Sequence, residues 1–402
     1  MTMSKKGPGH LPSPSEIAKC ALDFYNSPVH FPSNKGKPQP SREFTVYSAF
    51  VASRAVKKDG HENHELWVVS CATGSKCCAA KPIDQGLVLH DSHAEVLARR
   101  GLIRVLWKEI DHELGVKGND ADDGVAVLSK VAADSVRNND SNDIDEHKRL
   151  LEFIKPISPN ELPGFRLRQG VALHMYISDS PCGDASIYEL NDDNKNLKSS
   201  CNTCFTGAKI IVLDQSLSTS ASLQSTEALS EGVSIARENK QILGALRLKS
   251  GRSNIPAHLR SMSHSCSDKM CRWLAFGLQG SLLSMWIREP ITLSSVCVSR
   301  DKRSLHSDNH SGSQFIALKR ALCDRSKQAI VAADEIIASA RKARIKDDAL
   351  RWSKNLSKTT PRFHIVDEIF PFSKSETEYK NSLVRSKDHP NKDKIHNEEP
   401  EK

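Results

Sequence analysis

A histidine and a glutamate stand two residues apart, at His93 and Glu95, where a stretch with helical apolar spacing begins. An imidazole nitrogen is a common zinc ligand, and a carboxylate that stays off the metal can carry protons to and from a water that the metal holds. In the first turn of a helix these two side chains can serve the same water. The pattern therefore predicts that His93 binds a metal and that Glu95 is the catalytic proton carrier.

The other ligands must come from elsewhere, because a catalytic zinc has three protein ligands and one open position. Cys182 follows Pro181 between a predicted strand and a predicted helix, where a helix N-terminus would stabilise a thiolate. H-x-E together with Pro-Cys is typical of zinc-dependent nucleobase deaminases. The small cytidine and adenosine deaminases place a second cysteine in the same turn as P-C-x-x-C, but Ala185 stands there in this chain.

The third ligand is predicted to be Cys266, which begins another predicted helix and has Ser and Asp neighbours that can cap it. Its spacing from Cys182 cannot show that the two meet, so only the fold can. Two alternatives stay open: Cys201 and Cys204 form a C-x-x-C pair that suits a structural zinc site, and His264 could replace Cys266 as a ligand. The remaining cysteines considered are predicted to be small buried apolar residues: Cys77, Cys78, Cys271, Cys297 and Cys323.

Alternating helices and strands must position these residues, which predicts an α/β fold. Apolar residues at helical spacing predict helices, and β-branched and aromatic stretches predict strands. The expected helices are 17–25, 95–114 and 266–286, with Asp91 and Ser92 as N-cap candidates for the second. The expected strands are 43–51, 65–71 and 170–178, of which the first two form a hairpin across the turn 57–61.

Composition limits the class of protein. The 402 residues, with 38% hydrophobic content, suffice for a sizeable core, and the net charge of +8 favours an anionic partner. No apolar run is long enough to span a bilayer, and the N-terminus lacks the apolar core of a secretory signal. We therefore expect an intracellular protein of the nucleus or cytoplasm without a membrane partner. Its 11 cysteines at irregular spacing are predicted to be reduced thiols, some of them bound to metal.

Three parts are expected along the chain. They are a flexible N-terminus at 1–16, a catalytic domain at 17–372 and a disordered charged tail at 373–402. Two polar stretches within the domain, at about 119–145 and 191–232, are predicted to be surface insertions.

The motifs also carry a family resemblance. They are Ser70–Lys76, Asp91–Arg100, Ser178–Asp184 and Ser265–Trp273 with Gly277–Ser284. In this order they resemble the RNA adenosine deaminase (editase) domain family over roughly residues 15 to 300. The resemblance implies a cytidine-deaminase-like mixed sheet flanked by helices. It also implies that zinc is held by His93, Cys182 and Cys266, and that Glu95 is the proton shuttle.

The same resemblance implies a second cofactor, a buried inositol hexakisphosphate. The residues expected around it are Arg99, Arg100, Lys269, Arg272 and Trp273. Asp91 and Lys269 resemble the pair that links the zinc site to this polyphosphate. Ser75 and Lys76 resemble the loop that contacts RNA. The alternative interpretation is a solvated helix face for the arginines and a solvated loop for Lys76.

About 40 residues precede the first predicted strand, which is too few for the double-stranded-RNA-binding domains of the editing enzymes. The chain therefore resembles the tRNA-specific branch, which converts the adenosine just 3′ of the anticodon in alanine tRNA to inosine. No counterpart of the family's closing C-terminal helices follows about Phe372, so the C-terminal part is expected to be incomplete. The alternatives are a non-catalytic zinc- or RNA-binding protein and a deaminase of double-stranded RNA or free nucleosides.

Overall fold

The protein is described as a computed structural model. The structure describes residues 11–30, 38–39, 43–58, 61–78, 89–114, 146–155, 164–189, 208, 210–212, 243–249, 256, 260–301, 312–342, 360–368 and 370–371. The predicted insertion at 119–145 and the tail at 373–402 lie outside these residues, as do Cys201, Cys204 and most of the insertion at 191–232. Within the described part, no helix is both long and apolar enough to cross a membrane.

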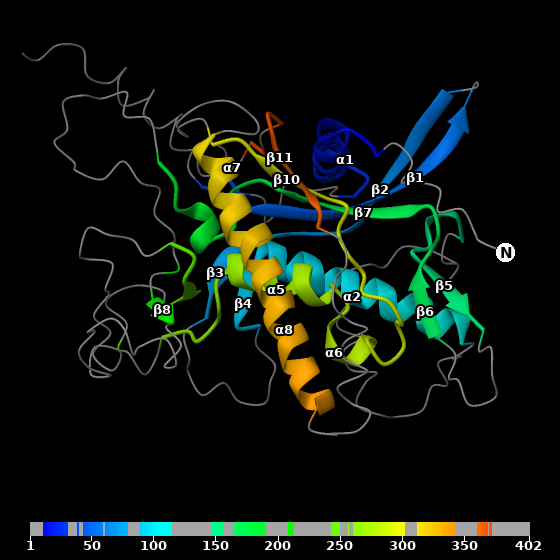
Figure 1. Cartoon of the computed structure of the whole chain (residues 1–402). Helices are drawn as coiled ribbons and strands as arrows, with labels where there is room; N and C mark the ends of the chain where they lie inside the picture. The colour runs from blue at the N-terminus through cyan, green and yellow to red at the C-terminus, as the bar shows by residue number, and fades with distance from the viewer. Residues whose placement is uncertain are drawn as a thin grey trace, which may run out of the picture.

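A five-stranded mixed sheet forms the centre of the fold, in the order β11-β10-β7-β1-β2 (Figure 1). Its strands are β1 (Tyr47–Lys58), β2 (His61–Thr73), β7 (Val171–Ile177), β10 (Ser295–Ser299) and β11 (Arg362–Val366). β1 is antiparallel to both β2 and β7, whereas β10 runs parallel to β7 and β11. The predicted α/β class and the predicted β1–β2 hairpin are both confirmed.

Helices cover both faces of the sheet because alternate residues of its strands are apolar on each side. Ala49 and Val51 of β1 face the core beneath α1 (Pro14–Asn26), and Phe50 and Ala52 face the opposite core. That second core is covered by α2 (Ala94–Glu113), α5 (Cys266–Phe276), α7 (Ser313–Leu318) and a π-helical turn η7 (Lys319–Asp324). The last turn continues into α8 (Arg325–Lys342), which lies against α5 (Figure 1).

Smaller elements complete the described part of the chain. They are β3 (Ser75–Cys77), β4 (Asp91–His93), η2 (Glu146–Lys148), β5 (Leu151–Ile154), β6 (Gly164–Leu167), η3 (Asp184–Ser186), β8 (Ile210–Val212), β9 (Leu246–Leu248) and α6 (Gly280–Leu283). The buried Glu109 carboxylate ties α2 to the β5–β6 hairpin, because it accepts backbone N–H groups of Leu150 and Leu151 at 2.7–3.0 Å.

Two predicted helix boundaries are wrong. α1 begins at Pro14, within the segment predicted to be flexible, because Ser13 and Glu16 form a capping box. The helix predicted over 266–286 ends at Phe276, because Gly277 adopts φ +88°, where a Cβ would lie 2.2 Å from Gln279 Oε1. Apolar spacing continues past this break since residues beyond it still face the same core.

One buried histidine links the sheet's stability to pH. His174 of β7 is fully buried and its Nε2 lies 2.8 Å from Ser53 Oγ. Burial, followed by the charges of His64 and His364, lowers the pKa of His174 to about 4. An unfolded histidine has a pKa of about 6.5. The unfolded chain therefore binds a proton that the folded chain does not as the pH falls from about 6.5 to about 4, and the free energy of unfolding decreases over that window.

We predict that His174→Gln reduces the decrease in the free energy of unfolding on acidification by up to about 3 kcal/mol. This is the free energy that corresponds to the difference between the folded and unfolded pKa values of His174. The measurement is urea unfolding of wild type and variant between about pH 7 and pH 4. His112→Gln on the exposed face of α2 is the control and should behave as wild type. Identical acid sensitivity of wild type and His174→Gln would contradict the prediction.

Candidate metal and catalytic site

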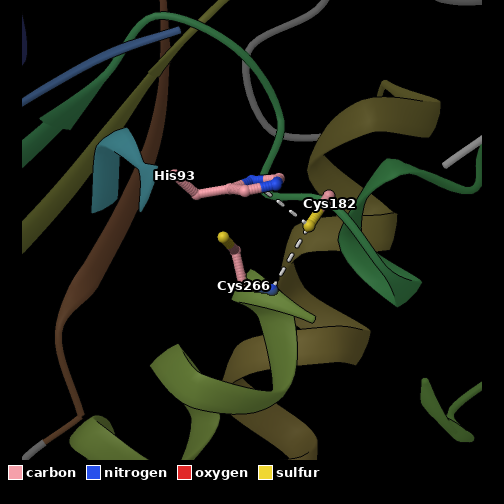
Figure 2. Close-up of side chains that lie close together, drawn as sticks. All are labelled: His93, Cys182 and Cys266. Carbon is pink, nitrogen blue, oxygen red and sulfur yellow. Dashed lines mark hydrogen bonds between the residues drawn. The ribbon is translucent and has the colours of Figure 1, made fainter. Parts of the chain in front are cut away.

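His93, Cys182 and Cys266 come from three distant segments and meet in space (Figure 2). The histidine nitrogen and the two sulfurs lie within 4.8 Å of one another, and His93 Nδ1 lies 3.7 Å from Cys182 Sγ. His93 ends β4, Cys182 lies in the loop after β7, and Cys266 begins α5. The structure therefore brings together the three predicted ligands, while the alternative ligand His264 is exposed.

The N-terminus of α5 holds the two cysteines together. The Cys266 backbone N–H donates to Cys182 Sγ at 3.4 Å, and the Ser267 N–H donates to the Cys182 carbonyl at 3.0 Å. Hydrogen bonding with Cys266 and with His93 lowers the pKa of the Cys182 thiol well below its usual value. The prediction that Cys182 begins its own helix is wrong, since only the single 3-10 turn η3 follows it. The helix end that faces this sulfur belongs to α5.

Glu95 lies in the first turn of α2, beside this cluster. It is 2% exposed, and its Oε2 is buried without a hydrogen-bond partner among the described residues. Burial, and then the charge of Cys182, raise the pKa of the Glu95 carboxyl. An ionisable oxygen placed in this way is free to exchange a proton with a small molecule bound next to the ligands.

Asp91 is not the helix cap predicted from sequence. His93 is the N-cap residue of α2 and makes no side-chain cap bond. The Asp91 carboxylate instead accepts the His93 N–H at 3.1 Å, the Lys249 ammonium at 2.7 Å and the Lys269 ammonium, together with the Ser263 hydroxyl at 2.9 Å. Burial alone would raise the pKa of Asp91, but Lys249 and Lys269 hold it well below its usual range.

Sequence reasoning missed Lys249. Its buried ammonium donates to Cys266 Sγ at 3.1 Å as well as to Asp91. Although burial opposes the charge, the thiolates and Asp91 raise the pKa of Lys249, so it stays protonated beside the sulfur. No motif surrounds it, since its position is set by β9 and by its backbone bond to the Ser263 carbonyl at 2.8 Å.

The prediction that Cys77 and Cys78 are buried apolar residues is wrong. Cys77 is half-buried and lies within 4.8 Å of His93 and Asp91, and Cys78 is exposed, so neither is the buried apolar residue predicted. β3 pairs with β4 and sets Ser75 opposite His93 and the exposed Lys76 opposite Ser92. The two residues predicted to contact RNA therefore lie next to the strand that carries a predicted ligand.

Four of the five residues predicted to surround a polyphosphate line one cavity of about 520 Å³: Arg99, Lys269, Arg272 and Trp273. The Arg99 guanidinium lies 5.2 Å from the centre of the Trp273 ring, and burial, followed by the charge of Arg272, lowers its pKa to about 10. Arg100 instead lines a second cavity of about 560 Å³ with Asp91. Lys269 lines both cavities.

The family model of the adenosine-deaminase (editase) domain matches residues 70–130 and 151–347, which hold all three candidate ligands and Glu95. The chain is 30% identical over 302 residues to the tRNA-specific adenosine deaminase 1 of Drosophila melanogaster, covering 74% of this chain and 57% of that protein. It is 28% identical over 326 residues to the double-stranded RNA-specific editase B2 of Mus musculus, covering 75% of this chain and 34% of that protein. The tRNA-specific adenosine deaminase 1 of Mus musculus is 26% identical over 396 residues, at coverages of 79% and 69%. The chain thus spans about a third to somewhat over half the length of the first two relatives.

Gly183 lets the two cysteine loops approach. It adopts φ +109°, and a Cβ there would lie 2.3 Å from the Oγ of Ser265, the residue that caps α5. We predict that Gly183→Ala separates Cys182 from Cys266 and weakens zinc binding by 10-fold or more, the usual scale for loss of a group that orients a ligand. Competition with a chromophoric chelator measures this affinity.

Gly170→Ala is the matched control, since Gly170 also has a positive φ, +84°, but nothing within 4 Å of the added Cβ. Both variants place alanine at a positive φ, but only the added Cβ of Gly183→Ala clashes with Ser265 at the start of α5. Equal zinc affinities in the two variants would refute the prediction.

Proposed function

Because this chain belongs to the adenosine-deaminase (editase) domain family, we propose that it hydrolyses adenosine in RNA to inosine with the help of a zinc ion. One observation carries the proposal. A ring nitrogen and two sulfurs converge from three segments beside the buried Glu95, whose Oε2 has no partner among the described residues. A carboxylate next to three metal-binding atoms is the arrangement that hydrolytic deamination of a nucleobase requires.

The donor set fits zinc. One imidazole and two thiolates are ligands that zinc accepts, and three protein ligands leave a fourth position for water. His93, Cys182 and Cys266 would hold the ion. The N-terminus of α5 favours the thiolate of Cys182, whereas burial and the neighbouring Cys182 raise the pKa of the Cys266 thiol, which the Lys249 charge opposes. When bound, zinc would supply the nucleophile, because it lowers the pKa of its water to about 7.

Glu95 moves the protons. It would accept one proton from the water as the oxygen attacks C6 of adenine and deliver it to N1. It would then carry the proton of the new C6 hydroxyl to the departing amino group. Adenosine and water thereby become inosine and ammonia, with no proton left over. The raised pKa of Glu95 suits this work, since a proton carrier is most effective when its pKa lies near the working pH.

We propose tRNA as the substrate, at the adenosine just 3′ of the anticodon in alanine tRNA. The Drosophila melanogaster relative named tRNA-specific is 30% identical to this chain over 302 residues, against 28% over 326 residues for the mouse editase. An adenosine in an anticodon loop leaves its stack more easily than one in a duplex. The net charge of +8 and the exposed Lys76 beside the site favour an RNA backbone. The similarity to the mouse editase makes double-stranded RNA the second candidate.

We also propose that the arginine-lined cavity binds inositol hexakisphosphate. Arg99 and Arg272 raise the positive charge there, and within the described part of the chain no carboxylate pairs with either. Burial, and then the charge of Arg272, lower the pKa of Arg99, and a polyanion beside the two guanidinium groups would offset both effects. Lys269 lines this cavity and bonds to Asp91, so the anion would be connected to the ligand strand β4.

Glu95→Gln should retain zinc and lose inosine formation by about 10²–10⁴-fold or more, the usual contribution of a proton carrier. The assay scores inosine in an alanine tRNA transcript and in a double-stranded RNA, with zinc measured on the same samples. Glu113→Gln, at the far end of α2 in a partly exposed ion pair with Arg149, is the control and should remain active.

The wild type separates the candidate functions. Inosine beside the anticodon supports the tRNA substrate, and inosine in the duplex alone supports the editing alternative. Zinc without inosine in either RNA supports a non-catalytic zinc- or RNA-binding protein. An active Glu95→Gln would contradict the proposed mechanism.

Inositol hexakisphosphate should raise the melting temperature of the wild type. A ligand at 100 times its dissociation constant stabilises the folded state by about 2.7 kcal/mol. Arg272→Gln should reduce this shift, and Arg104→Gln, an exposed arginine of α2 outside both cavities, should leave it unchanged. The prediction fails when the wild type shows no shift in differential scanning fluorimetry.

A further inference from the structure

Each candidate cysteine ligand is followed two residues later by a buried aspartate that binds an arginine of the same helix. Asp184 follows Cys182, and Asp268 follows Cys266. Arg320 Nε donates to Asp184 Oδ2 at 3.1 Å, and Arg325 Nη2 donates to Asp268 Oδ1 at 2.5 Å. A single helix therefore holds both cysteine loops.

A π-helical turn makes this double contact possible. Residues five apart in an α-helix are rotated by about 500°, which leaves their side chains roughly 140° apart. η7 (Lys319–Asp324) is wound with i→i+5 hydrogen bonds, so five residues complete little more than one turn. Arg320 and Arg325 consequently reach the same side of the helix, toward η3 and α5, while Ala321 and Leu322 stay in the core.

The Arg320 contact is multivalent. Its Nη2 also donates to the carbonyl oxygens of Asp184 and Ile187 at 2.8 and 3.0 Å, so this one guanidinium spans the whole turn after Cys182. The second oxygen of Asp184 accepts the Gly244 N–H at 2.9 Å. The Cys182 loop is thereby fixed both to the helix and to the segment that leads into β9.

The Arg325 contact is completed in the same way. Asp268 Oδ2 accepts the Arg247 N–H at 2.9 Å and the Ser265 hydroxyl at 2.6 Å, so the carboxylate bound by Arg325 also orients the cap of α5. Arg247 is itself buried, and burial lowers its pKa despite the nearby charges of Asp184 and Asp268. Both aspartates are thus held at several points by neighbouring elements.

We propose that Arg320 and Arg325 are positioning residues that set the separation of the Cys182 and Cys266 sulfurs. The inference rests on the proposed zinc site and explains why its geometry is fixed by the protein. Neither arginine lines the two cavities described above, so each acts on the metal site through its aspartate. The planar guanidinium has a fixed fork of donors that a lysine ammonium cannot reproduce. The arrangement of donors on the guanidinium therefore matters in addition to its charge.

The test compares Arg320→Gln, Arg325→Gln and the two corresponding lysine variants with wild type. Zinc affinity is measured by chelator competition. The visible spectrum of the cobalt-substituted protein gives a second readout, because its thiolate-to-metal and d–d bands depend on ligand geometry. Each glutamine variant should bind zinc about 10–100-fold more weakly and show altered cobalt bands. Lysine should rescue Arg325, which makes one bond to Asp268, more than Arg320, which makes three bonds.

Arg54→Gln is the matched control for loss of an arginine–carboxylate pair. Arg54 bonds to Glu65 at 2.8 Å on the β1–β2 hairpin and is 26% exposed, close to the 24% of Arg320. It should keep wild-type zinc affinity and cobalt bands even where its melting temperature falls. This separates an effect on the metal site from a general loss of stability.

Wild-type zinc affinity and cobalt bands in both glutamine variants would overturn the inference while leaving the proposed function standing. A wild type that binds neither metal would defeat the zinc site itself, and the inference with it. Where a glutamine variant does not fold, its lysine counterpart decides. Unchanged affinity and unchanged bands in Arg320→Lys count against the inference, and weaker binding with shifted bands supports it.

Discussion

The contact between the N-terminus of α5 and the Cys182 sulfur is the constraint on which the site depends. The Cys266 N–H reaches that sulfur at 3.4 Å, and the Ser267 hydroxyl donates to the Pro181 and Cys182 carbonyl oxygens at 3.1 and 2.9 Å. These bonds join segments that are far apart in the chain. Gly183 lies between them, and only a residue without a side chain fits there. The strand β4 brings His93 to the two sulfurs, so that three ligand atoms converge.

Burying this cluster creates a charge problem, which a chain of alternating charges solves. The Cys266 thiol and the Glu95 carboxyl are buried and Cys182 is half-buried, and an unpaired charge is strongly unfavourable in such a poorly hydrated region. Lys249 stands between Cys266 and Asp91, and Asp91 in turn binds Lys269, which borders the arginine-lined cavity. The electrostatics of the metal site and of the cavity are therefore coupled through one carboxylate. Removing Lys249 would leave the Cys266 sulfur without its neighbouring ammonium, and Asp91 would then be paired with Lys269 alone.

Local patterns predicted α1, α2, α5, β1, β2 and β7 and the residues that the structure gathers, because strands, helix starts and caps depend on neighbouring residues. They did not predict β10, β11 or the helices α7 and α8. His93 with Glu95, and Cys266 with its Ser265 cap, could be identified in this way. Lys249 could not, since its importance comes from a tertiary contact and it has no motif of its own. Asp91 was mistaken for a cap because its Oδ2 binds the distant Lys249 and Lys269, while its Oδ1 accepts the local His93 N–H. The helix predicted to follow Cys182 is replaced by the single turn η3. The helix N-terminus that contacts the Cys182 sulfur belongs to the distant α5, which local patterns around Cys182 could not indicate.

The same reasoning explains which groups the fold leaves unsatisfied. The oxygens of three carboxylates around the cysteines are all engaged. Oδ2 of Asp91 binds two lysines and its Oδ1 accepts the His93 N–H, and the oxygens of Asp184 and Asp268 accept arginines and backbone N–H groups. Glu95 is different, since its Oε2 is buried without a partner in the described part of the chain. Burial and the charge of Cys182 raise the pKa of this carboxyl. Its free oxygen is placed to exchange a proton with a molecule bound beside the ligands, and that exchange is the chemistry proposed for this site.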